Sequence, residues 1–234
     1  MTERAPVVIV TGAAQGIGKA CADRLVQDGW EVARTDRLAS DGILGCDVRD
    51  GAAVSALVAA VAAGNDGRID GLVNAAGLGR RSTFLEATDE LWLEMWDINV
   101  MGTVRMCRAA IPHLVASTHP ARGVVNFTSQ AAKTGGLAIG APYSSAKAAV
   151  LCLSQTLASE LGPQGVRVNA VAPGIVDTPF LDGVPEIKGR GPSLPLGRIG
   201  RPEEVAGTVS FLLSNDASYL TGETIDVNGG LLMD

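Results

Sequence analysis

The sequence is poor in the side chains from which metal sites and disulfide frameworks are built. Its 234 residues include two histidines and four widely separated cysteines, which lack the spacing of a metal-binding or redox pair. We therefore expect no metal site. The cysteines are interpreted as reduced, small apolar side chains of a cytoplasmic protein.

Long apolar runs are also missing. No stretch approaches the roughly 20 apolar residues that cross a bilayer. The N-terminus does not show the charged, apolar and cleavage regions of a signal peptide. These features predict a soluble chain without a membrane partner. The formal net charge of −6 argues against nucleic acid as a partner and favours a small molecule.

Short apolar runs alternate with helical patterns along the whole chain, in which hydrophobic residues make up 47%. The expected strands are 7–11, 30–35, 43–46, 69–73, 124–128, 166–171 and 224–227. The expected helices are 16–27, 52–63, 89–115 (one helix or two, since Pro112 lies near its end), 142–161 and 202–213. This alternation predicts a single doubly wound α/β domain over residues 1–234, with a parallel sheet of about seven strands and helices on both faces. Such sheets bind ligands at the carboxyl ends of their strands.

A glycine-rich turn connects the first expected strand to the first helix. Gly12 lets the chain turn off the strand, and Gly16 and Gly18 remove side chains where the backbone approaches a ligand or a neighbouring element. The free N–H groups of the helix would then face an anion. The turn is neither a P-loop nor G-x-G-x-x-G, because its spacing is Thr-Gly-x-x-x-Gly-x-Gly.

The end of the second expected strand carries Asp36. A carboxylate there can accept hydrogen bonds from an adenosine ribose and repel a 2′-phosphate. The alternative is a solvated turn aspartate. Arg34 lies two residues earlier, so we expect it to share a face with Asp36 and to neutralise it in part. Arg37 follows the strand and has no predictable direction.

A tyrosine and a lysine lie four residues apart in the first turns of the expected helix 142–161. Tyr143 and Lys147 therefore share a helix face. An ammonium about 4 Å from a phenol, at an effective dielectric of about 20, is worth roughly 4 kcal/mol or ~3 pKa units. We therefore expect Lys147 to bring the Tyr143 pKa towards neutrality, where general acid–base catalysis is efficient.

Two polar residues accompany this pair. Ser129 follows the expected strand 124–128, and Asn99 lies inside the expected long helix. A polar amide in an apolar stretch indicates a hydrogen-bonding role, although a satisfied buried amide with no function would look the same.

The glycine turn and these four residues, in this order, resemble the classical short-chain dehydrogenase/reductase family. The resemblance implies a Rossmann-like fold and an NAD(H)-dependent oxidoreductase of the alcohol or polyol dehydrogenase type. Hydride would move between nicotinamide and a secondary alcohol or ketone. By the same resemblance, Tyr143 is the general acid/base, and Lys147 lowers its pKa and holds the nicotinamide ribose. Ser129 would hydrogen-bond the substrate oxygen, and Asn99 would anchor a water that links Lys147 to solvent.

Further segments fit the same family. Asn74-Ala75-Ala76-Gly77 resembles the family's Asn-Ala-Gly segment, residues 173–178 resemble the segment that closes over the nicotinamide, and Asp47 matches a position that faces the adenine. The cofactor-binding residues implied by the resemblance are Gly12, Gln15, Gly16, Ile17, Gly18, Asp36, Asp47, Val48, Asn74, Ala75, Gly77, Tyr143, Lys147, Pro173, Gly174, Val176 and Thr178. Substrate specificity is expected in a loop around residues 180–200.

The alternatives concern cofactor, substrate and turnover. Asp36, together with Gln15 where phosphate-preferring relatives often have a cation, predicts NAD over NADP. An acyl-carrier-protein ketoreductase using NADPH and a dinucleotide-binding sensor without turnover remain alternatives. A serine hydrolase is excluded because neither histidine is placed as a base for Ser129. Arg80 and Arg81 could meet an acidic substrate but are more often solvated, and Gln130 could shape the substrate pocket.

Assembly is the last expectation. Helical stretches 91–115 and 143–161 carry more small and apolar residues than one sheet face needs. The resemblance implies that they pair with copies of themselves in a homotetramer, or in a homodimer. The alternative is that both helices are buried within one subunit.

Overall fold

The computed structural model describes residues 4–136, 139–183 and 185–233. In these residues the strands form one parallel sheet in the order β3-β2-β1-β4-β5-β6-β7. The strands are β1 (Val7–Thr11), β2 (Glu31–Asp36), β3 (Leu44–Gly45), β4 (Gly71–Asn74), β5 (Gly123–Phe127), β6 (Arg167–Pro173) and β7 (Thr224–Val227). The helices are α1 (Gly16–Gln27), α2 (Gly51–Ala63), α3 (Asp89–Trp96), α4 (Gly102–Ala116), α5 (Gln130–Thr134), α6 (Ala141–Leu161), α7 (Pro185–Lys188) and α8 (Pro202–Leu212). The predicted doubly wound α/β fold is confirmed.

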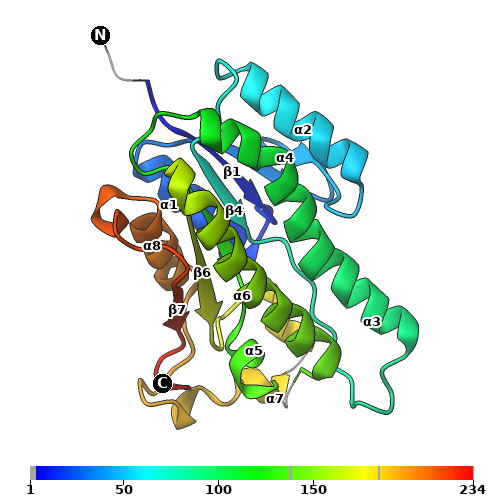
Figure 1. Ribbon diagram of the computed structural model, residues 1–234. Helices are drawn as coiled ribbons and strands as arrows, with labels where there is room; N and C mark the ends of the chain where they lie inside the picture. The colour runs from blue at the N-terminus through cyan, green and yellow to red at the C-terminus, as the bar shows by residue number, and fades with distance from the viewer. Residues whose placement is uncertain (1–3, 137–138, 184, 234) are drawn as a thin grey trace.

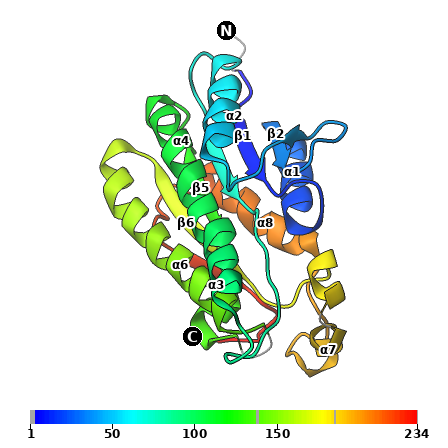
Figure 2. The same cartoon turned by 90° about the vertical axis from the view of Figure 1, so that its right-hand side faces the viewer.

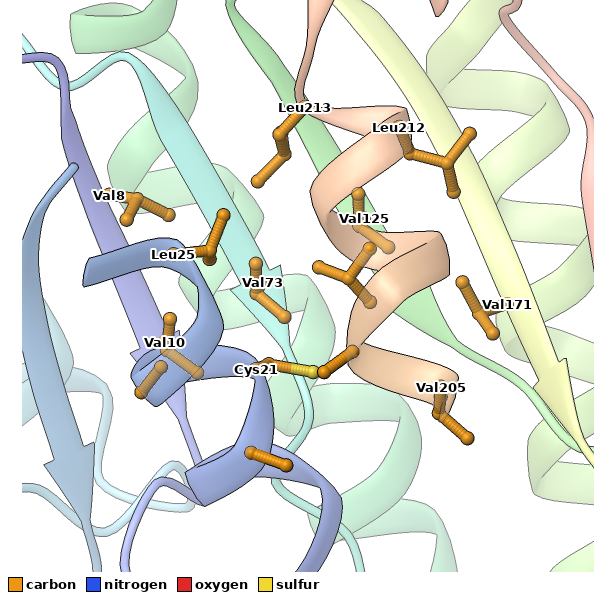
Figure 3. Close-up of a cluster of buried hydrophobic side chains, with 14 of the residues drawn as sticks. Val8, Val10, Cys21, Leu25, Val73, Val125, Val171, Val205, Leu212 and Leu213 are labelled. Atoms are coloured by element: carbon orange, nitrogen blue, oxygen red, sulfur yellow. The ribbon is translucent and has the colours of Figure 1, made fainter. Parts of the chain in front are cut away.

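Helices cover both faces of the sheet (Figures 1 and 2). On one face, α1 and α8 lie side by side and bury an apolar cluster against β1, β4, β5 and β6 (Figure 3). On the other face, α2, α4 and α6 cover a second cluster that includes Ile9, Leu72 and Val168. Because both faces are covered, β1 and β4 to β6 are buried along their whole length and their sequences are mostly apolar.

The expected long helix 89–115 is two helices joined by a π-helical segment, η1 (Asp97–Met101). The break therefore falls at Asn99 and not at Pro112, which lies within the last turns of α4. A proline this close to a helix end removes a single intrahelical bond and the helix continues. Single π turns inside helices are frequent at functional sites.

The sheet order reverses between β1 and β4, since β1 pairs with β2 on one side and with β4 on the other. The loops that leave these two strands therefore diverge and leave a crevice at their carboxyl ends. The short connection between β2 and β3 contains no helix among the described residues. Within the described residues, no helix combines the length and apolarity needed to cross a membrane.

Candidate active site

A cleft of about 1000 Å³ opens at the carboxyl ends of the central strands. It extends from the glycine turn after β1 to the segment that follows β6. The sequence-predicted residues that line it are Gly12, Gln15, Gly16, Ile17, Gly18, Asp36, Asp47, Val48, Ala75, Gly77, Asn99, Ser129, Tyr143, Lys147, Pro173, Gly174, Val176 and Thr178. Of the predicted site residues, Asn74 does not line the cleft.

The glycine turn is built for close approach. Gly12 and Gly16 have positive φ angles of 67° and 56°, which side chains other than glycine rarely adopt. A Cβ on Gly18 would lie 2.1 Å from the carbonyl oxygen of Gly12, so helix α1 rests directly on the turn. Gln15, at the Ncap of α1, makes no side-chain capping bond. The bare turn and the uncapped helix start suit the pyrophosphate of a dinucleotide.

The Asp36 carboxylate faces this turn from the end of β2. Its Oδ2 accepts a hydrogen bond from the Ala14 backbone N–H at 3.0 Å, and its Oδ1 accepts one from the Arg37 backbone N–H at 2.7 Å. The prediction that Arg34 neutralises Asp36 is wrong. Arg34 donates instead to Asp23 of α1, with Nη1 2.5 Å from Oδ1.

Asp47, just after β3, is held by a residue that the sequence reasoning missed. Arg49 makes a bidentate pair with it, with its Nη2 at 2.6 Å from Asp47 Oδ2, and this pair lowers the Asp47 pKa. The two-residue spacing of Asp47 and Arg49 is the only sequence signal for this contact. The intervening Val48 is buried and packs against Gly102, where a Cβ would lie 2.7 Å from Val48 Cγ2.

Asn74 belongs to a buried polar network beneath the cleft. Its Nδ2 donates to Asn126 Oδ1 at 2.8 Å, and Asn126 donates in turn to Ser154 Oγ at 2.9 Å. These bonds join β4, β5 and α6 below the site. Asn74 therefore supports the strands that carry the cleft and does not reach into it.

Ser129, Tyr143 and Lys147 converge in the centre of the cleft. Lys147 on α6 is buried, donates to the Phe127 carbonyl oxygen at 2.8 Å, and has its Nζ 5.8 Å from the centroid of the Tyr143 ring. The Ser129 hydroxyl caps α5 by accepting from Ala131 N–H at 3.2 Å, and its interaction with Tyr143 favours a lower Tyr143 pKa. The cleft therefore brings a phenol, a hydroxyl and an ammonium together.

Asn99 joins this group from the π segment. Its side-chain amide pairs with the backbone of Leu78, accepting from N–H at 3.2 Å and donating to C=O at 2.9 Å. A Cβ on Gly77 would lie 2.9 Å from Asn99 Oδ1 and 3.4 Å from Lys147 Nζ, so the amide and the ammonium flank the same glycine. The π turn thereby ties the loop after β4 to the central cluster.

The pKa values of the pair are set chiefly by burial. Burial raises the Tyr143 pKa from 10.0 to about 12, and the Ser129 hydrogen bond opposes this shift. Burial lowers the Lys147 pKa from 10.5 to about 8. The expectation that Lys147 brings the Tyr143 pKa towards neutrality is therefore wrong for the chain alone. The Lys147 ammonium is bonded to Phe127, and desolvation of the phenolate dominates. At neutral pH the phenol keeps its proton.

At the other end of the cleft, many of the lining side chains are apolar. The sequence patterns did not predict which residues line this end. Phe180 lies against the Tyr143 ring, with centroids 5.8 Å apart, and against Gly79, where a Cβ would lie 2.3 Å from its ring. Ile139, Leu181, Ile187 and Leu231 also line this end. The single aromatic residue in the expected substrate loop was the available signal for Phe180.

Polar and charged side chains also line the cleft. Gln130, Arg80 and Arg190 contact the cleft, whereas Arg81 pairs with Glu186 of α7. In the part of the chain that the structure describes, no group of three or more His, Cys, Asp or Glu is placed to hold a metal ion.

Comparison with known proteins agrees with this geometry. The family model described as "Enoyl-(Acyl carrier protein) reductase" matches residues 12–232. The short-chain reductase protein NovJ of Streptomyces niveus is 41% identical over 249 residues, covering 96% of this chain and 93% of the relative. A 3-oxoacyl-(acyl-carrier-protein) reductase of Synechocystis is 37% identical, covering 98% of each chain. The ligand-free aldohexose dehydrogenase of Thermoplasma acidophilum superimposes with a TM-score of 0.85 at 33% identity, covering 97% of this chain and 94% of that one.

The sheet, the glycine turn and the Ser-Tyr-Lys cluster define an oxidoreductase of the kind that binds a nicotinamide dinucleotide. The chain belongs to the short-chain dehydrogenase/reductase family.

Proposed function

We propose that the protein moves a hydride between NAD(H) and a secondary alcohol or ketone, with Tyr143 as the general acid/base. The observation that carries the proposal is the convergence of Ser129, Tyr143 and Lys147 in the same cleft as the bare glycine turn. A ketone placed among them would find a proton donor and a second hydrogen-bond donor for its oxygen.

Each side chain has a distinct role in this proposal. The protonated phenol of Tyr143 donates its proton to the substrate oxygen during reduction and takes it back during oxidation. Ser129 positions that oxygen, and Lys147 holds the nicotinamide ribose and supplies positive charge beside the phenol. Asn99 fixes the neighbouring loop and anchors a water that connects Lys147 to solvent. The bound cofactor supplies the hydride acceptor or donor.

The cofactor is proposed to be NAD, with NADP less favourable. The Asp36 carboxylate at the turn would accept hydrogen bonds from both ribose hydroxyls and would repel a 2′-phosphate. The proposed contacts are the residues named for the cofactor above, with Asn74 acting from beneath. The ion pair of Arg34 with Asp23 supports this choice, because it leaves the Asp36 charge without that neighbour.

A 3-oxoacyl thioester is the second candidate substrate. Similarity to the short-chain reductase NovJ, to the Synechocystis enzyme and to a putative ketoacyl reductase of the monensin polyketide synthase favours it. The name of the aldohexose dehydrogenase favours a sugar or polyol instead. Asp36 weighs against the NADPH dependence that we attached to the ketoreductase alternative. We place substrate selection in the loop around residues 180–200, whose Phe180 and Leu181 line the cleft.

The protein is further proposed to act as a homotetramer or homodimer on a small-molecule substrate. Helices α3 and α6 contact one another. On α3, Leu93 is 69% exposed and Trp96 is 44% exposed, and both line a groove together with Met101 and the charged residues Arg49, Glu94 and Asp97. Apolar side chains gathered on one exposed face favour contact with a second copy.

The test is turnover of NADH and NADPH with matched panels of ketones, polyol-derived ketoses and 3-oxoacyl thioesters. Tyr143→Phe should lower kcat by about a thousandfold or more while cofactor binding persists. Tyr219→Phe is the matched control, because Tyr219 is the chain's other tyrosine and is fully exposed. Cofactor binding without turnover of any substrate would favour the sensor alternative, and near-normal turnover by Tyr143→Phe would refute the mechanism.

A further inference from the structure

The cations around the substrate end of the cleft differ in their partners. Four of them are joined to carboxylates in ion pairs. The pairs are Arg80–Glu94, Arg81–Glu186, Lys133–Asp226 and Lys188–Asp177. Arg190 lines the same cleft, yet among the described residues no hydrogen bond or ion pair joins its guanidinium to another protein group. A positive charge in the cleft wall is thus left available for a ligand.

The backbone under Arg190 is fixed. Its N–H donates to the Ile187 carbonyl at 3.0 Å, and its own carbonyl accepts from Ser193 N–H at 2.9 Å and from Ser193 Oγ at 2.8 Å. The next residue, Gly191, is buried so tightly that a Cβ would lie 3.2 Å from Ile199 N. The side chain therefore extends from an anchored turn just after α7, which stands at one end of the molecule (Figure 2).

Several apolar side chains line the cleft together with Arg190. Ile187 and Leu181 belong to a small buried cluster that holds α7 in place, and both line the cleft. Phe180 and Leu231 line the same end. An apolar wall with an unpaired cation is complementary to a ligand with an apolar body and an anionic group. A guanidinium is well suited to that anion, because its planar fork can donate two hydrogen bonds to a carboxylate or a phosphate.

We propose that Arg190 recognises an anionic group of the substrate. This group is a carboxylate or a phosphate that lies at a distance from the reacting carbonyl. The inference rests on the proposed ketone reduction and adds the chemical class of its substrate. Arg80 and Arg81, which the sequence offered for an acidic substrate, have their charges paired with Glu94 and Glu186. Arg190 is a specificity residue in this account and takes no part in the proton transfer.

Two sources of the anion are distinguished by matched substrate pairs. One pair is a ketone with a terminal carboxylate and its methyl ester. The other is a 3-oxoacyl-coenzyme A, which carries phosphates, and the corresponding N-acetylcysteamine thioester, which is neutral. For each pair, the readout is the ratio of kcat/KM for the anionic member to that for the neutral member.

The wild-type ratio should exceed one for at least one pair and should fall roughly tenfold or more in Arg190→Ala, as expected for losing charge-assisted hydrogen bonds. Arg190→Glu should lower the ratio further, so that the neutral member becomes the better substrate. Lys188→Ala is the matched control, since it removes a positive charge from the same segment but one that is paired with Asp177. Its ratio should stay near the wild-type value.

The outcomes separate the two proposals. A preference in the carboxylate pair alone or in the thioester pair alone supports the inference and identifies the anion. Equal ratios in wild type, Arg190→Ala and Arg190→Glu would overturn it while leaving ketone reduction intact. If wild type reduces neither neutral member nor any other ketone, the proposed function itself has failed.

Discussion

Two carboxylates at the adenosine end of the cleft are held in different ways. Among the described residues, Asp36 accepts hydrogen bonds only from the backbone N–H groups of Ala14 and Arg37, whereas Asp47 is bound by the guanidinium of Arg49. A carboxylate bonded to a cation has its charge largely balanced, and one bonded to amides keeps its full negative charge. Asp36 is therefore the residue that can exclude a second negative charge from this end of the cleft.

This contrast gives a prediction for cofactor choice. Asp36→Ala should narrow the preference for NAD over NADP by roughly tenfold or more, chiefly by weakening the NAD interaction, because it removes both the ribose acceptor and the repulsion. The measurement is kcat/KM for the two cofactors. Asp41→Asn is the control, since Asp41 is an exposed carboxylate in the following loop and does not line the cleft. A wild-type preference for NADP, or an unchanged preference in the variant, would contradict the role of Asp36.

At the scale of elements, the start of α1 is pressed against the turn that leaves β1. Gly18→Ala would place a methyl group 2.1 Å from the Gly12 carbonyl oxygen, which is backbone and cannot turn aside. We expect a loss of about 1–3 kcal/mol in the free energy of unfolding, as for overpacked cores, and weaker cofactor binding because the turn must shift. Denaturant unfolding and cofactor titration measure the two effects.

The control for this prediction is Gly207→Ala. Gly207 lies inside α8, and a Cβ there would meet only Arg24 Nη1, at an ordinary contact distance of 3.9 Å. An alanine there should be neutral or stabilising, by up to about 1 kcal/mol, because alanine loses less backbone entropy than glycine when a helix forms. If Gly18→Ala were as stable as Gly207→Ala, the close packing of α1 on the turn would not matter energetically.

Elements with strong local signals were predictable from the sequence. The continuous apolar runs of β1 and β5 and the Asp28-Gly29 stop after α1 depend on neighbouring residues alone. The π turn at Asn99 was not predictable, because it depends on the pairing of its amide with Leu78, a residue far away in the chain. The short helix α5 was missed for a similar reason, since its five residues are too few to show a helical period.

The candidate site divides in the same way. Spacing placed Tyr143 and Lys147 on one helix face, and chain order placed Ser129 beside them. The partners of charged groups were not predictable: Arg34 forms an ion pair with Asp23, and Asp47 forms one with Arg49. A long charged side chain can reach several acidic residues, and the tertiary structure determines with which of them it forms an ion pair.

For the whole molecule, the exposed apolar face of α3 predicts an interface between copies. Leu93→Glu should shift the protein towards monomers, because it replaces an apolar side chain of the groove, which Trp96 and Met101 also line, with a charge. Light scattering or sedimentation at micromolar concentration measures the mass. Leu38→Glu is the control, since Leu38 is also 69% exposed but lies in the loop after β2. A monomeric wild type, or equal masses for both variants, would contradict the interface.

The buried Lys147 predicts how the stability of the whole chain depends on pH. Its pKa is about 8 in the folded chain and near 10.5 when unfolded. Below pH 8 the ammonium is charged in both states and its burial opposes folding. Between about pH 8 and 10.5 the folded chain has lost this proton and the unfolded chain still binds it, so the contribution of Lys147 to stability rises with pH.

Buried thiols act in the opposite direction over part of this window. Burial raises the pKa of Cys21 and of Cys107 from 9.0 to about 12, so above pH 9 the unfolded chain loses these protons first and stability falls. The contribution of Lys147 must therefore be isolated by comparing the wild type with a variant that lacks this lysine.

Lys147→Met, which has a similar volume and no charge, keeps both thiols. The stability of this variant relative to wild type should be greatest below pH 8 and should decline by about 3 kcal/mol as pH rises to 10.5. Denaturant unfolding without cofactor across this range measures it, with Lys19→Met as an exposed-lysine control. A pH-independent difference between Lys147→Met and wild type would mean that the Lys147 pKa is not lowered by burial.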